Sequence, residues 1–315
     1  MRTHSFITLL ALCSTMATAQ PGSLDACFAE GGILVLHPET VPMAETDVVS
    51  DVIALPDHSL LIGGTAYHDG AQVMFMAHVL EDGSLDTAFG TDGGYTFFPV
   101  GWQAYGTSLA QGPGGGIYLA GYAMLTNYQE IVLLAHTDAM GIPDLGFGVN
   151  GTVSTPLGNQ NTRVYGMVVQ PDGKVVLGGY TQLQTADILF LRYNADGTLD
   201  SSFGNGGKRI CTDYPGDEEY IHDIALLDDG TLVATGLIAF YSVPNYTLLA
   251  RVDADGDFMA GFGDNGVLLP FCCDMESAGH GIASTGDGFL VTGYVEIGFQ
   301  AIPRSFWLLS MPMAA

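Results

Sequence analysis

An eleven-residue segment that recurs along the chain is the feature that most constrains the fold. Its best-defined copy runs from Gly197 to Gly207 with the sequence GTLDSSFGNGG, and other copies begin at Gly22, Gly83, Gly141 and Gly256. We call these five copies marker segments. Each has a phenylalanine at its seventh position, and these phenylalanines lie 61, 58, 56 and 59 residues apart: Phe28, Phe89, Phe147, Phe203 and Phe262. A near-constant period of this length predicts an array of similar supersecondary units.

The sequence between the markers predicts β-strands in every period. In the fourth period, short runs rich in β-branched and aromatic residues lie between turn residues, at 208–212, 221–227, 231–236 and 246–252. Asp229 and Gly230 separate two of these runs, and an Asp-Gly pair favours a tight hairpin turn. We expect the same hairpin in the other periods, with turns at Asp57-His58, Gly114-Gly115, Asp172-Gly173 and Asp287-Gly288.

Five periods of four strands, without helical periodicity, predict an all-β fold: a five-bladed β-propeller of four-stranded blades built from repeats of about 58 residues. An elongated stack of sheets is the alternative. Residues 20–315 are expected to form this single domain. In the propeller, each marker is expected to carry the chain from the outer strand of one blade to the inner strand of the next, with its phenylalanine between blades. The expected inner strands begin near Ile33, Tyr95, Thr152, Lys208 and Val267.

Two phrases of the sequence resemble a known repeat. Residues 171–179 (PDGKVVLGG) and 191–204 (LRYNADGTLDSSFG) are similar to the delta-60 repeat, a propeller-type repeat of bacterial secreted and surface proteins. The resemblance covers the chain from Gly22 onward. The first and fifth copies depart from it, with Ala29 in place of the glycine after Phe28 and Met259 in place of the aspartate. The resemblance implies a propeller fold and no established activity.

Residues 1–19 are expected to be a secretory signal peptide. Arg2 and His4 precede an apolar run at 6–12, and Ala17-Thr18-Ala19 supplies small residues before the expected cleavage site. That run is too short to span a bilayer, and no later apolar run reaches the length that a transmembrane helix needs. We therefore expect a secreted protein (periplasmic, at the cell surface or extracellular) that is a monomer and has no transmembrane segment.

The charge balance excludes one class of partner. The formal net charge is −26, with 34 acidic residues against 8 Lys and Arg. Nucleic-acid binding requires clustered cations, so a nucleic-acid partner is not expected. Solubility, a saline habitat and cation binding remain as explanations of the acidic surface.

The cysteines and the first marker suggest how the ring closes. Four cysteines follow the signal peptide, and the sequence alone leaves three pairings open. The marker at Gly22 precedes the first blade, whereas no marker follows the last strand. We hypothesise that this copy fills the junction between the fifth and first blades. A disulfide from Cys27 to Cys272 or Cys273 would fasten it.

Charged residues recur at fixed places around the markers. His78, His136, Arg192 and Arg251 occupy equivalent positions, and eight residues after each of them stand Asp86, Asp144, Asp200 and Met259. A cation and a carboxylate that recur together predict a charge-assisted contact that holds each marker to its blade. A ring of ligand-binding groups is the alternative.

Two further patterns are candidate metal sites. Ser50, Thr107, Tyr165, His222 and His280 share one strand position, and the two histidines lie in adjacent blades. Asp253, Asp255 and Asp257 place oxygens at alternate positions, like the start of a calcium loop, although Phe258 stands where such a loop needs glycine. Calcium is the candidate cofactor, and ordinary turn chemistry is the simpler interpretation.

The expected inner strands contain no Asp or Glu, whereas glycoside hydrolysis needs a pair of carboxylates. The sequence also lacks a nucleophile elbow, a zinc-protease motif and a phosphate loop. It therefore favours a non-catalytic secreted propeller that binds an unknown protein or glycan. One alternative is a carbohydrate-active hydrolase or lyase with loop-borne acids such as Asp217, Glu218 and Glu219. A calcium-stabilised adhesion domain is the other.

Overall fold

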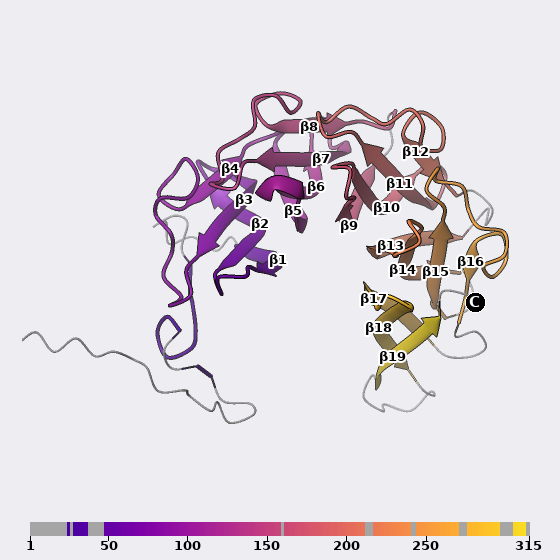
Figure 1. Ribbon diagram of the computed structural model, residues 1–315. Helices are drawn as coiled ribbons and strands as arrows, with labels where there is room; N and C mark the ends of the chain where they lie inside the picture. Colours follow the sequence, from indigo (N-terminus) through magenta and orange to yellow (C-terminus); the bar gives the residue numbers. More distant parts are fainter. Residues whose placement is uncertain are drawn as a thin grey trace, which may run out of the picture.

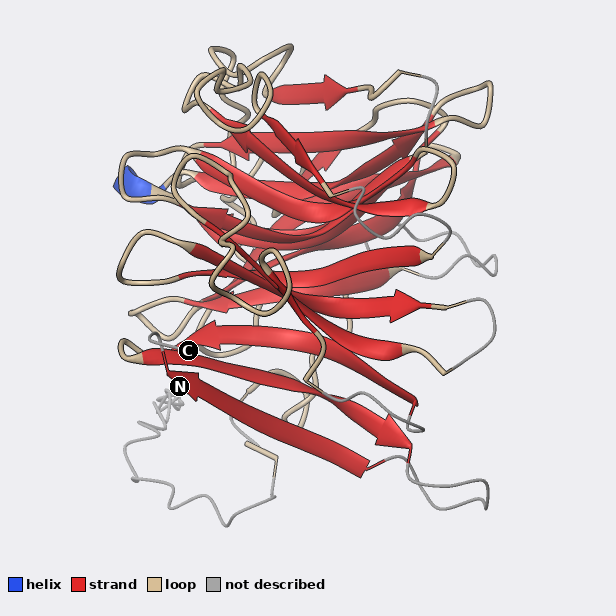
Figure 2. Cartoon of the chain, turned by 90° about the vertical axis from the view of Figure 1, so that its right-hand side faces the viewer, coloured by secondary structure: helices blue, strands red, loops and turns tan. Residues whose placement is uncertain are grey.

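The computed structural model describes residues 24–25, 28–36, 47–158, 161–211, 217–240, 244–270, 276–296 and 305–312. This part of the chain is all-β apart from one short 3₁₀ helix, η1 (Pro113–Gly115). Figure 2 shows the strands stacked from sheet to sheet, with turns and loops at both of their ends. The expected signal peptide, Cys27, Cys272 and Cys273 lie outside the described residues.

The strands form five antiparallel sheets, each continuous in sequence. The first contains β1 (Val48–Ala54), β2 (Leu60–His68), β3 (Ala71–Val79) and β4 (Tyr95–Phe98). The second contains β5 (Gln103–Gln111), β6 (Ile117–Met124), β7 (Glu130–Thr137) and β8 (Thr152–Thr155). The third contains β9 (Thr162–Val169), β10 (Val175–Gln182), β11 (Ala186–Tyr193) and β12 (Lys208–Ile210). The fourth contains β13 (Glu218–Leu226), β14 (Leu232–Ala239), β15 (Tyr246–Val252) and β16 (Val267–Leu268), and the fifth contains β17 (Glu276–Ser284), β18 (Gly288–Glu296) and β19 (Ser305–Pro312).

The expected assignment of strands to blades is wrong by one strand. The segments that begin at Tyr95, Thr152, Lys208 and Val267 do not start new sheets. They are β4, β8, β12 and β16. Each is the fourth strand of its sheet and pairs with the third strand of that sheet. The marker therefore lies within a sheet, between its third and fourth strands. The described residues around Ile33 form only an isolated bridge to Glu30.

The innermost strands are instead β1, β5, β9, β13 and β17. First strands of neighbouring sheets contact one another, and Figure 1 shows them along the inside of an arc, with β4, β8, β12 and β16 outside. The five predicted hairpins are present between the first and second strands of each sheet. Their turns use positive φ at His58, Gly114, Gly173, Gly230 and Gly286.

Each marker phenylalanine in a junction between sheets is buried there. Phe89 packs with Met74 and Met76 of the first sheet and Leu119 of the second. Three others take the same place at the next three junctions: Phe147, Phe203 and Phe262. Phe28 packs on the free face of the first sheet, among Ile62, Phe75 and Val79. The markers thus join neighbouring sheets through their phenylalanines.

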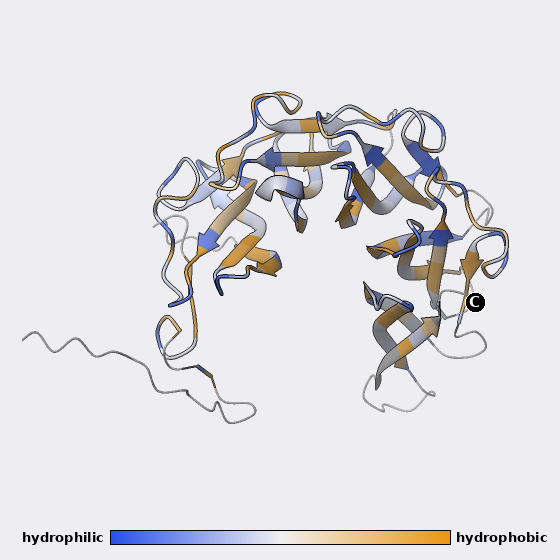
Figure 3. Cartoon of the chain, viewed as in Figure 1, coloured by the Kyte–Doolittle hydropathy of each residue, from blue (hydrophilic) through white to orange (hydrophobic). Residues whose placement is uncertain are grey.

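The two ends of the arc lie apart (Figure 1). On β1, Val48, Val49 and Val52 are about half exposed, and much of this strand is coloured as hydrophobic in Figure 3. The residues equivalent to Val52 in the next three sheets are buried under the preceding sheet: Leu109, Met167 and Ile224. Five sheets agree with the predicted blade number, whereas ring closure by the first marker stays a prediction.

Candidate ligand-binding face

A β-bulge interrupts each of the five innermost strands at the same position. The register shifts between Val49 and Asp51 in β1, and equivalent shifts occur in the other four sheets. The bulged residues are Ser50, Thr107, Tyr165, His222 and His280. They are the strand column that the sequence offered as a candidate site, and bulges commonly re-aim side chains next to functional sites.

A glycine opposite each bulge explains how the column is built. A Cβ on Gly121 would collide with the carbonyl oxygen of Tyr105 on the neighbouring strand. Gly64, Gly179 and Gly236 face the same kind of backbone oxygen in their own sheets. Glycine is therefore required at these positions because the bulged strand approaches too closely for any side chain.

Aromatic rings from four sheets lie around the bulges, and those of the third, fourth and fifth sheets contact one another from sheet to sheet. Tyr105 stacks on Tyr122 at 4.9 Å between ring centroids, Tyr180 meets Tyr220 at 4.8 Å, and His222 stacks on His280 at 5.4 Å. Further ring contacts run from Tyr165 to His222 and from His280 to Tyr294. All these rings are partly or fully exposed. We call the eight residues the aromatic belt: Tyr105, Tyr122, Tyr165, Tyr180, Tyr220, His222, His280 and Tyr294.

Arg163 on β9 continues the belt between the second and third sheets. Its guanidinium lies 4.7 Å from the ring centroid of Tyr122, and it donates two hydrogen bonds of 2.6 Å to the buried carboxylate of Glu130 on β7. Burial raises the pKa of both Tyr122 and Tyr180 to about 12. The belt therefore presents neutral phenols beside one fixed ion pair at neutral pH.

His222 has a defined proton position. Its Nδ1 lies 2.7 Å from the carbonyl oxygen of Gly279, and a carbonyl only accepts, so Nδ1 carries the hydrogen. Thr107, the equivalent residue of the second sheet, donates in the same way to Val164 O at 2.8 Å. Burial lowers the pKa of His222, with the nearby His280 acting in the same direction. The bulged residues thus connect one innermost strand to the next.

The innermost strands carry carboxylates, contrary to the sequence-based expectation that they carry none, and two of these carboxylates directly follow a bulge. Asp51 follows the bulge of β1, and Asp223 follows the bulge of β13. Each accepts a backbone N–H from the next sheet, from Leu109 at 2.8 Å and from Ile282 at 2.9 Å respectively. Burial raises the pKa of Asp223, and the charge of Asp51 adds a smaller effect in the same direction. The sequence did not reveal this pair, because the strands expected to be innermost are in fact the fourth strands of the sheets.

The other candidate acids do not lie in a loop together. Glu218 and Glu219 belong to β13, next to Asp217. Glu218 accepts a hydrogen bond of 2.7 Å from the belt residue Tyr220, and Glu219 is buried. Glu218 is therefore at the rim of the belt.

The predicted ion pairs between third strands and markers have hydrogen-bonding geometry in three periods. His78 Nδ1 lies 2.9 Å from Asp86, His136 Nδ1 lies 3.1 Å from Asp144, and Arg192 Nε lies 2.7 Å from Asp200. In the fourth sheet, where Met259 replaces the aspartate, Arg251 instead pairs with Asp229 at 2.7 Å. The first three contacts hold marker loops to their sheets, whereas Arg251 bonds the hairpin turn of its own sheet.

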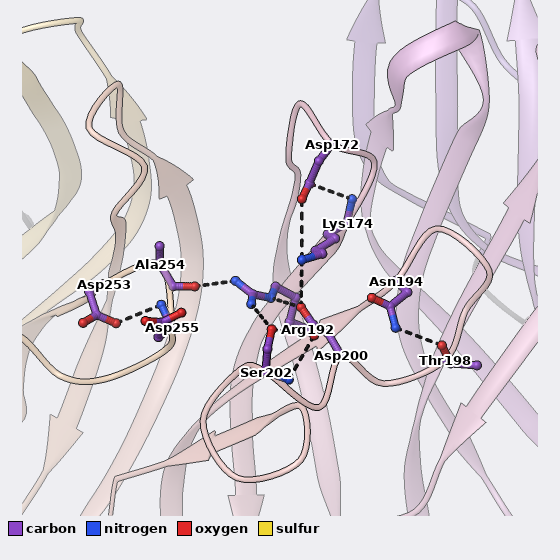
Figure 4. Close-up of polar contacts among 10 residues, drawn as sticks. All are labelled: Asp172, Lys174, Arg192, Asn194, Thr198, Asp200, Ser202, Asp253, Ala254 and Asp255. Carbon is purple, nitrogen blue, oxygen red and sulfur yellow. Dashed lines mark hydrogen bonds and ion pairs between the residues drawn. The ribbon is translucent and has the colours of Figure 1, made fainter.

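The pair in the third sheet also reaches the fourth sheet (Figure 4). The buried Arg192 donates to Ser202 Oγ at 3.1 Å and to the carbonyl oxygen of Ala254. Burial alone would raise the pKa of Asp200, but hydrogen bonds from Ser202, Lys174 and Arg192 outweigh it and lower this pKa well below its ordinary range. Arg192 thus links the third and fourth sheets through its hydrogen bonds.

The first sheet has a serine, histidine and aspartate in series. Ser59 Oγ lies 2.8 Å from His78 Nε2, and His78 Nδ1 bonds Asp86. Ser59 is buried, and its hydroxyl also lies 2.6 Å from the carboxylate of Asp57. Lys174 and Thr231 occupy the position of Ser59 in other sheets, so this series is a variant of the repeated contact between strand and marker. Because Ser59 is buried, the series has no accessible nucleophile.

The candidate metal residues form no metal cluster. Asp253 accepts the backbone N–H groups of Asp255 and Asp257 at 3.0 and 2.9 Å, while Asp257 pairs with Arg209 at 3.1 Å. This is turn chemistry. Across the described ranges, no group of three or more His, Cys, Asp or Glu side chains could hold a metal ion. None of the described helices is long and apolar enough to cross a membrane.

Comparisons with known proteins agree with the fold. A family model described as a domain of unknown function (DUF5122) beta-propeller matches residues 55–89 and 170–203, each of which runs from a hairpin turn to the phenylalanine of the following marker. No curated protein matches the chain in sequence.

Several solved structures are similar at low identity. A protein of unknown function from Dyadobacter fermentans is 12% identical over 81% of this chain and 73% of its own, with a TM-score of 0.47. A PL25 polysaccharide lyase, an ulvan lyase, is 10% identical over 78% and 66%, with a TM-score of 0.44. Fructan 1-exohydrolase IIa from Cichorium intybus is 11% identical over 75% and 49%, with a TM-score of 0.34. At such scores these similarities carry no argument about activity.

Proposed function

We propose that this chain is a secreted, non-catalytic glycan-binding module of the delta-60 type, released after cleavage of the signal peptide at residues 1–19. The aromatic belt is the observation that carries the proposal. Sugar rings present apolar C–H faces between polar hydroxyl edges, and partly exposed aromatic rings with nearby polar groups suit both. The belt extends over four sheets, so it offers an extended surface for an oligosaccharide.

Polar groups beside the rings support the same ligand class. The hydroxyl of Tyr294 donates to Glu276 at 3.2 Å, and that of Tyr105 donates to Gln103 at 2.8 Å. Near the same end of the second sheet, Trp102 and Tyr128 form an exposed edge-to-face pair at 5.7 Å. Carboxylates and amides of this kind accept hydrogen bonds from sugar hydroxyls.

The test is a glycan binding screen with the mature protein, followed by titration of the strongest glycan. Tyr122→Ala and Tyr180→Ala are expected to weaken binding by about tenfold or more each, the effect of losing one aromatic anchor. Val149→Ala, at the opposite ends of the strands, is the matched control and should leave glycan affinity unchanged. Absence of glycan binding, or unchanged affinity in both tyrosine variants, would overturn the proposal.

A second candidate function follows from the two carboxylates that directly follow bulges of innermost strands, Asp51 and Asp223. Asp223, with its raised pKa, suits a general acid, and Asp51 suits the partner carboxylate of a carbohydrate-active hydrolase. Their hydrogen bonds to backbone N–H groups favour a structural role instead. Release of reducing ends from a bound glycan by the wild type, abolished in Asp223→Asn and Asp51→Asn, would favour the hydrolase over the binding module.

A further inference from the structure

The junction between the second and third sheets contains a cavity of about 560 Å³ beside the hydrogen bond between His136 and Asp144 of the third marker. His136 and Asp144 line it from the second sheet, and Gly173 and Ala195 line it from the third. At the next junction Arg192 stands in the position of His136, and its guanidinium donates to Ala254 O, the equivalent of Ala195 O. An imidazole is too short for this reach. The space that one guanidinium occupies at one junction is therefore open at the other.

The cavity favours a cation. Burial lowers the pKa of His136, so the ring is neutral at neutral pH and donates Nδ1–H to Asp144. Asp144 and Asp138 then leave the lining with negative charge. At the next junction Arg192 and Lys174 both lie within ion-pair distance of Asp200. The net charge of −26 has the same sign as the cavity and adds to the attraction.

The marker loop beside the cavity is unusually apolar. Four of its side chains are 43 to 77% exposed: Met140, Ile142, Leu145 and Val149. At the equivalent positions the fourth marker has Asp196, Thr198, Ser201 and Asn205, and the second has Asp82, Ser84, Thr87 and Thr91. Exposed apolar residues that cluster around a pocket, where sister loops are polar, indicate a docking surface. Ile142 and Leu145 themselves line the cavity.

The two sheets are also joined less tightly here. Elsewhere the residue after the marker phenylalanine donates its backbone N–H to the carbonyl oxygen of the residue just before the next marker. These bonds run from Gly90 to Met140, from Gly204 to Asp255 and from Ala29 to Asp82. The equivalent bond from Gly148 to Asp196 O is missing, although the structure describes both residues. The cavity thus lies at a junction that lacks two hydrogen bonds seen elsewhere in the repeat. These are the bond from the guanidinium to the next sheet and the backbone bond from the residue after the phenylalanine.

From the cavity, its charge and its apolar loop, we propose that the third marker is a docking site for an arginine-bearing peptide segment of a partner protein. The partner's guanidinium enters beside Asp144 and donates to Ala195 O, as Arg192 does within the chain at the next junction. Apolar residues that flank the arginine pack on Ile142, Leu145 and their neighbours. The volume far exceeds one guanidinium group and leaves room for these flanking residues.

Calorimetric titration of the full mature protein tests the site with three probes: the blocked tripeptide Leu-Arg-Leu, its lysine counterpart Leu-Lys-Leu, and agmatine. We expect Leu-Arg-Leu to bind one to one and more tightly than the other two. His136→Arg fills the cavity with the protein's own guanidinium and should weaken Leu-Arg-Leu binding by about tenfold or more, the size of a hot-spot loss. Leu145→Ser should weaken peptide binding and leave agmatine binding unchanged.

Each other outcome overturns a defined part of the proposal. Equal affinity of the arginine and lysine peptides would rule out guanidinium recognition. Agmatine binding as tightly as the peptide would identify a free guanidinium compound as the ligand and remove the role of the apolar loop. No binding, or unchanged peptide binding in His136→Arg, would rule out the site.

Leu80→Ala, at an exposed residue directly after β3 and outside both proposed sites, is the control and should bind the peptide like the wild type. Glycan binding, measured in parallel on every variant, shows that each is folded if the glycan-binding proposal holds, and circular dichroism shows it otherwise. The two proposals therefore fail independently.

Discussion

Two neighbouring junctions share the same backbone arrangement but differ in whether a side chain fills them. They are the junction between the second and third sheets and the junction between the third and fourth. Arg192 closes the second of these by bonding its own marker and the neighbouring sheet, whereas His136 stops short and leaves a cavity. The markers differ accordingly, since the loop beside the cavity is apolar and the loop beside Arg192 is polar. The third copy of the repeat therefore lacks a contact between sheets that the fourth copy makes, and a cavity lies in its place.

The largest expected effect tests Arg192 as the link between the third and fourth sheets. Among the described residues, Arg192→Ala leaves Lys174 as the one basic group within ion-pair distance of the buried Asp200. The free energy of unfolding should therefore fall by about 3–5 kcal/mol, as for a broken buried ion pair. Urea denaturation measures it. His136→Ala at the open junction should cost much less. Equal losses at the two positions would contradict the contrast between the junctions.

Acid should reveal the same pair. The folded-state pKa of Asp200 lies below its ordinary value of 3.8, so its carboxylate stabilises the fold above that pH. This contribution is lost as the pH falls below about 4 toward the lowered pKa, because the unfolded state then takes up the proton first. Asp200→Asn should therefore show a flatter acid dependence of the urea midpoint than the wild type. Parallel curves for the two proteins would contradict this.

Filling the open junction should stabilise it modestly. His136→Arg can form the bonds to Asp144 and Ala195 O that Arg192 forms in the next repeat, and we expect a gain of about 1 kcal/mol, typical of a filled surface cavity with a new ion pair. Differential scanning calorimetry would detect the higher Tm. A lower Tm would mean that the two junctions differ in backbone geometry as well as in this side chain.

The smallest effect concerns the apolar loop. Replacing four residues by their counterparts from the fourth marker (Met140→Asp, Ile142→Thr, Leu145→Ser and Val149→Asn) should change the free energy of unfolding by no more than about 0.5 kcal/mol, since these side chains are exposed. Urea denaturation would check this. A large loss of stability would show that the apolar residues serve the fold and would remove a support for the docking site.

Much of the architecture could be read from the sequence. The period, the five hairpins and the contacts from His78, His136 and Arg192 to the aspartates eight residues later follow from local patterns, because turn residues and charges recur at fixed spacing. The phase of the repeat could not be read. A periodic sequence can be divided at any point, and only long-range pairing, such as that of β4 with β3, shows where one sheet ends.

That error of phase decided what was missed at the candidate site. Because the wrong strands were expected to be innermost, Asp51 and Asp223 were not expected near the centre of the arc. For the same reason, His222 and His280 were not connected with the surrounding tyrosines. The belt itself gave a weak signal, since its tyrosines look like ordinary strand residues and only the packing of neighbouring sheets brings rings such as Tyr180 and Tyr220 together. The opposing glycine, as at Gly121, was the available clue, because a glycine inside a strand often marks a bulge.

The continuity of each sheet in sequence has a consequence for synthesis. Strands pair only with their neighbours along the chain, so a sheet can complete its backbone hydrogen bonds as soon as its fourth strand has left the ribosome. Only the face that packs against the next sheet then waits for later residues. Folding can therefore proceed in the order of translation, one sheet at a time, and a pulling force applied to the two ends should remove sheets singly rather than all at once.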